Sequence, residues 1–279
     1  MNRREFTLSC LGALAVAGAS GAGLLPDSAA AQQAQPQPAP ARTGETPHIA
    51  FLLFDGMTAL DMIGPATVLA NSGFTVDYVW RNADPVYAET TSDKRLGLLP
   101  TATFGDVGAA DILCVPGTSN PYAQIVQPDI IEWVAHVGQR ATWVTSVCTG
   151  SFLLGAAGLL KGYRATAHWT MVDELAYFGA TPVRERVVRD RNRVIGAGVS
   201  SGIDFGLVLL ALIHGEQTAR MWQLIMEYDP HPPFDSGSPH TADPQLVEAV
   251  RSNSTGNRVP YARKSLEDAA KRLGVTVAG

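Results

Sequence analysis

Cysteine is scarce in this sequence, which has 279 residues but only Cys10, Cys114 and Cys148. So few cysteines exclude a fold stapled by many disulfides, and the chain must rely on a hydrophobic core. Cys114 lies inside the apolar run Ile112–Val115 and is predicted to pack in that core, without a disulfide bond to Cys148. Any cysteine chemistry in the folded body would therefore rest on Cys148.

Clusters of positive charge and long apolar runs are also scarce. The net charge is −5, and Lys and Arg are scattered apart from Arg184–Arg193, a strand-like segment predicted to be a solvated hairpin. We therefore expect no nucleic-acid partner. Beyond the N-terminus no run of eighteen or more strongly apolar residues occurs, which predicts a soluble body. About 210 residues of ordinary composition remain, enough for one α/β domain with a large core.

The N-terminus has the pattern of a twin-arginine export signal. The pair Arg3-Arg4 precedes a weakly apolar run and then Ala29–Ala31, small residues typical of a cleavage site. We predict that residues 1–31 are a signal peptide, that the protein is periplasmic, and that it meets a membrane only during export. An ordinary basic leader or an uncleaved anchor is the alternative. Residues 32–46, rich in Gln, Pro and Ala, are predicted to be a disordered linker.

Alternating strand and helix patterns predict an α/β fold with a doubly wound, flavodoxin-like, mostly parallel sheet and helices on both faces. The segments expected as strands are His48–Phe54, Phe74–Trp80, Ala110–Val115, Thr142–Val147 and the pair Pro182–Arg189 and Arg193–Ala197. Helices are expected from about Pro65, in the first turn, toward Asn71, and over Asp129–Arg140, Ser151–Ala157, Met171–Phe178, Ile203–His214 and Glu216–Glu227. We expect one domain over residues 47–240 and a helical tail, 241–279, whose last helix is frayed.

Cys148 lies where a predicted core strand changes abruptly into a predicted helix, the arrangement of a nucleophile elbow. The helix N-terminus is expected to favour the thiolate form of Cys148. The backbone N–H groups of Thr149 and Gly150 are expected to point toward any oxyanion formed there. Asp61 and the Gly117-Thr118 loop also follow predicted strands, and in a parallel sheet such positions meet at one edge. An inert core cysteine is the alternative for Cys148, and a helix-capping carboxylate is the alternative for Asp61.

Six stretches carry a resemblance to a known family, and three of them are longer than the others. These three read FLLFDGMTALDMIGPATVL at residues 51–69, VTSVCTGSFLLGAAGLLKGYRATAHW at residues 144–169 and EYDPHPPFDSGSP at residues 227–239. The sequence resembles the ThiJ/PfpI superfamily, of class I glutamine amidotransferase-like fold, and within it the isonitrile hydratases. The resemblance covers nearly all of the predicted domain.

The resemblance implies a cysteine-dependent hydro-lyase that adds water to a small-molecule isonitrile and gives an N-formamide. It implies Cys148 as the nucleophile, Asp61 as the acidic partner near its sulfur, and Thr149 as a hydroxyl that bonds the thiolate or orders water. The backbone at Gly117 and Thr118 would line the anion site. It also implies a homodimer, with no cofactor and no metal.

The sequence departs from the family pattern in one loop, and other functions stay open. Residues 118–122, Thr-Ser-Asn-Pro-Tyr, replace the glycine-rich loop expected after Gly117. A reactive-carbonyl hydrolase or glyoxalase is one alternative, and a non-catalytic periplasmic cysteine-based stress or ligand sensor is another. The triplet His214-Gly215-Glu216 has the spelling of an amidotransferase pair, but it ends a predicted helix and is interpreted as chance. His168 is interpreted as a core or pocket-wall residue.

Overall fold

The computed structural model describes residues 46–254 and 259–276 of the chain. The predicted signal peptide and all but the last residue of the predicted linker lie outside these residues. Within the described part, no helix combines the length and the apolar character needed to cross a membrane.

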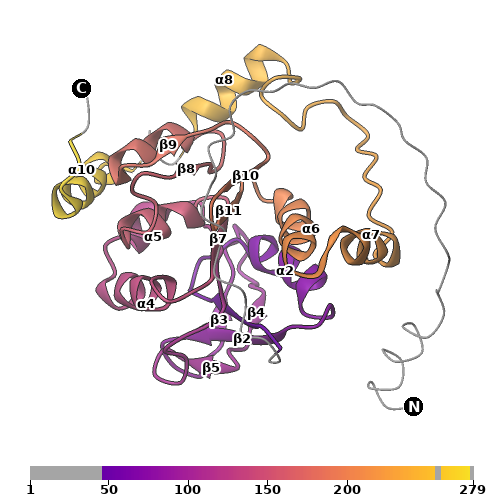
Figure 1. The fold of residues 1–279 in the computed structure, drawn as a ribbon. Coiled ribbons are helices and arrows are strands. Elements are labelled where there is room, and N and C mark those ends of the chain that lie inside the picture. The colour runs from indigo at the N-terminus through magenta and orange to yellow at the C-terminus, as the bar shows by residue number, and fades with distance from the viewer. Residues whose placement is uncertain (1–45, 255–258, 277–279) are drawn as a thin grey trace, which may run out of the picture. The chain divides into compact units, whose positions relative to one another are not determined.

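A seven-stranded sheet, mostly parallel, is the centre of the described fold (Figure 1). Its strands are β1 (His48–Leu52), β2 (Thr75–Trp80), β5 (Ala102–Thr103), β6 (Ile112–Val115), β7 (Trp143–Val147), β10 (Val187–Asp190) and β11 (Arg193–Gly196). Their spatial order is β10-β11-β7-β6-β1-β2-β5, and only the β10–β11 pair is antiparallel. The five central strands therefore run in the flavodoxin-like order, as the sequence predicts.

Helices cover both faces of this sheet. They are α2 (Ala59–Leu69), α3 (Pro121–Gln124), α4 (Pro128–Gly138), α5 (Gly150–Ala156), the 3-10 helix η1 (Val172–Phe178), α6 (Ser201–His214), α7 (Glu216–Ile225), α8 (Pro244–Ser252) and α10 (Ala262–Leu273). Figure 1 shows α4 and α5 on one face and α2, α6 and α7 on the other. Glycine permits the tight packing of α6 on α2, because a Cβ at Gly206 would lie 3.1 Å from the Cβ of Val68.

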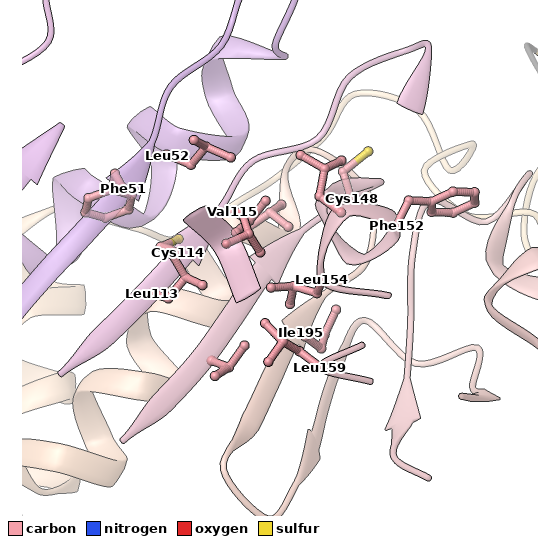
Figure 2. Close-up of a cluster of buried hydrophobic side chains, with 14 of the residues drawn as sticks. Phe51, Leu52, Leu113, Cys114, Val115, Cys148, Phe152, Leu154, Leu159 and Ile195 are labelled. Carbon is pink, nitrogen blue, oxygen red and sulfur yellow. The ribbon is translucent and has the colours of Figure 1, made fainter. Parts of the chain in front are cut away.

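The core is built from strands that are buried on both faces, as parallel strands are when helices cover them. All of β6 and β7 is buried, and so is β1 after its first residue. Figure 2 shows part of this core, with Phe51, Leu113 and Cys114 packed among neighbouring apolar side chains. Cys114 is 0% exposed and is a free cysteine, which confirms its predicted packing role.

Two short sheets lie beside the main one. One pair joins β3 (Val86–Tyr87) to β4 (Gly97–Leu98), and a second pair joins β8 (Arg164–Ala165) to β9 (Thr181–Pro182). The arginine-rich hairpin is β10 with β11, but it is not solvated throughout. Arg193 is buried, its Nε donates to the carbonyl oxygen of Leu159 at 2.8 Å, and its guanidinium lies over the ring of Tyr163.

Two local expectations are wrong. Pro65 lies in the middle of α2 and not in its first turn, because the helix already begins at Ala59. The last helix is not frayed, because α10 packs against η1 and buries its apolar edge, including Leu266 and Ala269. It ends at Gly274 in the left-handed conformation that commonly closes a helix.

Candidate active site

Cys148 lies on a strained turn between β7 and α5. Its φ is 59°, a left-handed value that is uncommon for a residue other than glycine and that often marks a functional site. Its N–H donates to the carbonyl oxygen of Gly196 at 3.0 Å, which ties the turn to the end of β11. The sequence predicts this elbow, and the backbone geometry confirms it.

Two glycines let the neighbouring segments approach Cys148. A Cβ at Gly150 would lie 2.2 Å from the carbonyl oxygen of Val115, so α5 begins directly against the end of β6. A Cβ at Gly117 would lie 2.7 Å from Thr149 Oγ1 and 2.8 Å from Asp61 Oδ2. Both glycines are therefore required by close packing at the site.

Asp61 is a buried carboxylate that reaches across to the loop after β6. It lies in the first turn of α2 and is 0% exposed. Its Oδ2 accepts from the N–H of Gly117 at 2.9 Å, so Asp61 does not act as a helix cap. Its Oδ1 is buried with no hydrogen-bond partner among the described residues. A buried carboxylate oxygen without a partner is costly and indicates a functional group.

Side chains occupy the N–H groups of the loop that follows Gly117. Thr149 Oγ1 accepts from the N–H of Thr118 at 2.8 Å and donates to the carbonyl oxygen of Thr118 at 2.6 Å. The N–H of Ser119 donates to Oε2 of Glu89 at 2.8 Å. Since the N–H of Gly117 is bonded to Asp61, an anion at Gly117 or Thr118 would have to break one of these bonds.

The altered loop sequence fits this arrangement without strain. None of residues 117–120 has a positive φ, so the backbone does not require a second glycine at position 118. Thr118 is 4% exposed, and its hydroxyl donates to the carbonyl oxygen of Gly56 at 2.7 Å. The side chain that replaces glycine therefore anchors the loop.

Burial sets the protonation of the pair formed by Asp61 and Cys148. Burial raises the pKa of Asp61 from 3.8 to about 7; the N–H of Gly117 and the nearby thiol oppose the shift, and the charge of Glu89 adds to it. Burial and the negative charge of Asp61 also raise the pKa of Cys148 well above its usual value, although the N–H of Thr149 opposes the shift. Desolvation therefore opposes the expected thiolate, which the N–H of Thr149 favours.

The sulfur faces a cavity of about 460 Å³. The cavity is lined by Thr58, Glu89, Thr118, Ser119, Cys148, Thr149, His168, Thr170, Met171, Val199, Ala249, Val250, Asn253 and Ser254. His168 is a wall residue, as predicted, and burial lowers its pKa, so it is neutral at pH 7. His214 is not among the lining residues and lies against the ring of Phe74, in keeping with the interpretation of its triplet as chance.

The structure brings all six predicted site residues together. Cys148, Thr149 and Thr118 line the cavity, and Asp61, Gly117 and Gly150 lie behind them in direct packing. Sequence reasoning missed Glu89, which lies in the irregular segment between β3 and β4, and the four lining residues of the tail. Neither segment contains a recognisable motif, so its residues can be assigned to the cavity only from the folded structure.

A model of the DJ-1/PfpI family matches residues 47–212. The chain belongs to that family. A family relative, isonitrile hydratase of Pseudomonas putida, is 45% identical over 207 residues, which make up 74% of this chain and 89% of that enzyme. A ThiJ/PfpI family protein from Pseudomonas syringae has a crystal structure that matches with a TM-score of 0.72 and 38% identity, over 88% of this chain and 97% of that one. The HTH-type transcriptional regulator CdhR of Pseudomonas aeruginosa is 27% identical over 61% of this chain and 51% of its own length.

Proposed function

We propose that the protein is an isonitrile hydratase, which adds water to R–N≡C and releases an N-formamide. The identity of 45% to the Pseudomonas putida enzyme supports this reaction class. Cys148 is the nucleophile and Asp61 is the proton carrier, since the buried carboxylate lies beside the cysteine that lines the cavity.

In the first step the Cys148 thiol adds across the terminal carbon of the isonitrile. The ionised carboxylate of Asp61 removes the thiol proton while sulfur bonds to that carbon, and it then donates the same proton to the carbon. The product is a thioimidate, Cys148–S–CH=N–R. A pKa of about 7 suits Asp61 to this task, because such a carboxyl group both accepts and releases a proton near neutral pH.

In the second step water adds to the thioimidate carbon. One proton of the water goes to nitrogen, and its oxygen bonds to carbon. The C–S bond then breaks, the hydroxyl proton returns to sulfur through Asp61, and the N-formamide leaves. Atoms and charge balance over the cycle, and the Cys148 thiol is regenerated.

The observation that carries the proposal is the 45% identity to the Pseudomonas putida hydratase, and the occupied N–H groups in the loop at Gly117–Ser119 fit it. Hydrolysis of a carbonyl compound through a covalent cysteine adduct develops a negatively charged oxygen, which needs free hydrogen-bond donors. Here Asp61, Thr149 and Glu89 already accept from those three N–H groups. Addition of a thiol to an isonitrile forms no oxyanion, so the hydratase needs no free donor in this loop. A reactive-carbonyl hydrolase would have to use the N–H groups of Thr149 and Gly150 at the elbow instead.

The sensor alternative has weaker support. Oxidation of a cysteine to sulfenic or sulfinic acid follows its thiolate character and its exposure. Cys148 is 5% exposed and its pKa is raised, both of which slow that chemistry.

We also propose export to the periplasm and a homodimer. The paired arginines at positions 3 and 4 support export, and the resemblance of the domain supports the dimer. Fractionation of cells that express the full chain, and sedimentation of the purified protein, test the two proposals.

The test of the reaction is formamide production from cyclohexyl isonitrile by the purified protein. We expect turnover by the wild type, none by Cys148→Ala, and a strong loss in Asp61→Asn. Cys114→Ala is the matched control, because it removes the other buried cysteine and should keep most of the activity. Full activity of Cys148→Ala, with its fold confirmed by circular dichroism, would refute the mechanism.

A further inference from the structure

His168 lines the cavity, and the mechanism above gives its side chain no role. It follows β8 and lies in a tight turn, because the N–H of Met171 donates to the carbonyl oxygen of His168 at 2.9 Å. The imidazole ring lies beside the loop after β11, where a Cβ at Gly198 would be 3.6 Å from its Cδ2. The same loop holds the elbow, since the carbonyl oxygen of Gly196 accepts from the N–H of Cys148. One short segment therefore contacts both the ring and the nucleophile.

Hydrogen bonds fix which ring nitrogen of His168 carries the proton. The N–H of Thr170 donates to Nδ1 at 3.4 Å, and the hydroxyl oxygen of Thr170 lies 2.8 Å from the same atom. A backbone N–H can only donate, so Nδ1 is an acceptor and the proton of the neutral ring is on Nε2. Burial lowers the pKa of His168, which keeps the ring neutral at pH 7. Nε2 has no hydrogen-bond partner among the described residues, so its N–H is a donor that the cavity wall offers to a ligand.

The second step of the proposed mechanism calls for such a donor. Addition of water gives the adduct Cys148–S–CH(OH)–NH–R. When its C–S bond breaks, the electron pair goes to sulfur and the hydroxyl proton moves to sulfur through Asp61. Partial negative charge then develops on the oxygen that becomes the formamide carbonyl. The N–H groups of Gly117–Ser119 are already bonded, so this oxygen has to find its donor elsewhere in the cavity.

We propose that His168 is a catalytic residue, whose Nε2–H donates a hydrogen bond to the adduct oxygen and then to the carbonyl oxygen of the N-formamide. Thr170 is a positioning residue, which acts by keeping Nδ1 an acceptor. His168 keeps its proton throughout, so Asp61 still carries the transferred proton, and atoms and charge balance as before. The inference rests on the proposed hydratase function and adds the group that speeds release of the product from sulfur.

Substitutions separate the donor from the shape of the ring. His168→Phe keeps a planar ring and removes the donor, so kcat for cyclohexyl isonitrile should fall about 100-fold. By contrast, kcat/KM covers only the steps up to thiol addition and should change by less than about 3-fold. His168→Gln places an amide N–H₂ near the position of Nε2 and should recover about 10-fold of the lost kcat. His231→Phe, in the exposed proline-rich segment, is the matched control and should keep the wild-type kcat.

The covalent intermediate gives a readout that a merely structural role would not produce. During turnover by His168→Phe, mass spectrometry of the quenched protein should show Cys148 carrying one isonitrile, because breakdown is slowed and addition is not. The wild type should show little of this species. Thr170→Val should accumulate it with about a 10-fold fall in kcat, and Thr170→Ser should restore the wild-type pattern. Equal falls in kcat and kcat/KM for His168→Phe, with no covalent species, would overturn the inference.

A measurement without turnover distinguishes failure of this inference from failure of the proposed function. In Cys148→Ala labelled with ¹⁵N-histidine, NMR should show His168 as the Nε2–H tautomer, and N-cyclohexylformamide should shift the Nε2–H resonance. The Nδ1–H tautomer, or formamide that binds without moving this resonance, would overturn the inference. If the resonance shifts while the wild type shows neither turnover nor a covalent species, the hydratase function is overturned and the donor site at His168 stands.

Discussion

Asp61 gives the most quantitative prediction, because burial raises the free energy of its ionised form. Its pKa is 3.8 for an ordinary aspartate and about 7 in the fold. Since the folded value lies above the unfolded one, the contribution of Asp61 to stability is fully present below about pH 4 and is lost as pH rises through about 7. Each pKa unit corresponds to 1.36 kcal/mol, so ionised Asp61 destabilises the fold by roughly 4 kcal/mol above pH 7.

Asp61→Asn should therefore be more stable, relative to the wild type, at pH 8 than at pH 4. The amide oxygen can still accept from Gly117, while the amide N–H₂ sits where Oδ1 has no partner. That unpaired donor costs about 1–3 kcal/mol at every pH and shifts the whole curve without changing its shape. The pH-dependent part of the difference should reach roughly 4 kcal/mol, or about 10 °C in melting temperature for a domain of this size.

The assay is urea unfolding of both proteins from pH 4 to pH 8, with the two free-energy curves subtracted at each pH. Subtraction cancels the titration of every other carboxylate. Asp93→Asn, in the exposed segment between β3 and β4, is the control and should parallel the wild type. Parallel curves for Asp61→Asn and the wild type would refute the assignment of a raised pKa to Asp61.

Three further predictions follow from contacts at the site. Glu89→Gln removes a charge that raises the pKa of Asp61. The acid limb of the pH profile of kcat/KM, which we expect near pH 7, should therefore move to lower pH. An unchanged limb would show that Glu89 does not act on Asp61. Thr149→Val leaves the N–H and the carbonyl oxygen of Thr118 unpaired, so calorimetry should show a loss of about 2 kcal/mol or more with a fall in turnover, whereas Thr149→Ser should restore both. Gly150→Ala drives a methyl group against Val115 and should lower the melting temperature by several degrees, whereas Gly237→Ala, which meets open space, should leave it within about 2 °C.

The sequence was sufficient for the arrangement of the sheet because buried parallel strands leave a strong signal. His48–Phe54 and Thr142–Val147 are continuous apolar or β-branched runs, and both contain the expected strands. The elbow at Cys148 was equally predictable. The predicted core strand runs directly into the predicted helix, so too few residues lie between them for a longer loop.

The electrostatics of the site could not be predicted from the same pattern. The expected thiolate at Cys148 followed from its place at a helix start, but the pKa depends on how completely the sulfur and Asp61 are removed from water. Glu89 and α8 were missed for a related reason. Their segments carry no periodic signal, and they reach the cavity only through long-range packing.

The loop at Gly117–Ser119 owes its conformation to residues far away in the chain. The N–H groups of those three residues are bonded by Asp61, Thr149 and Glu89, which belong to three separate segments. The side chains of Ser119 and Asn120 can therefore change while residues elsewhere hold the path of the backbone, whereas Thr118 also anchors the loop through its own hydroxyl. Grafting this loop alone into a relative would transfer its amino-acid sequence but not its backbone conformation. An evolving enzyme could likewise change side chains at the rim of the cavity while Asp61 stays aligned with Cys148.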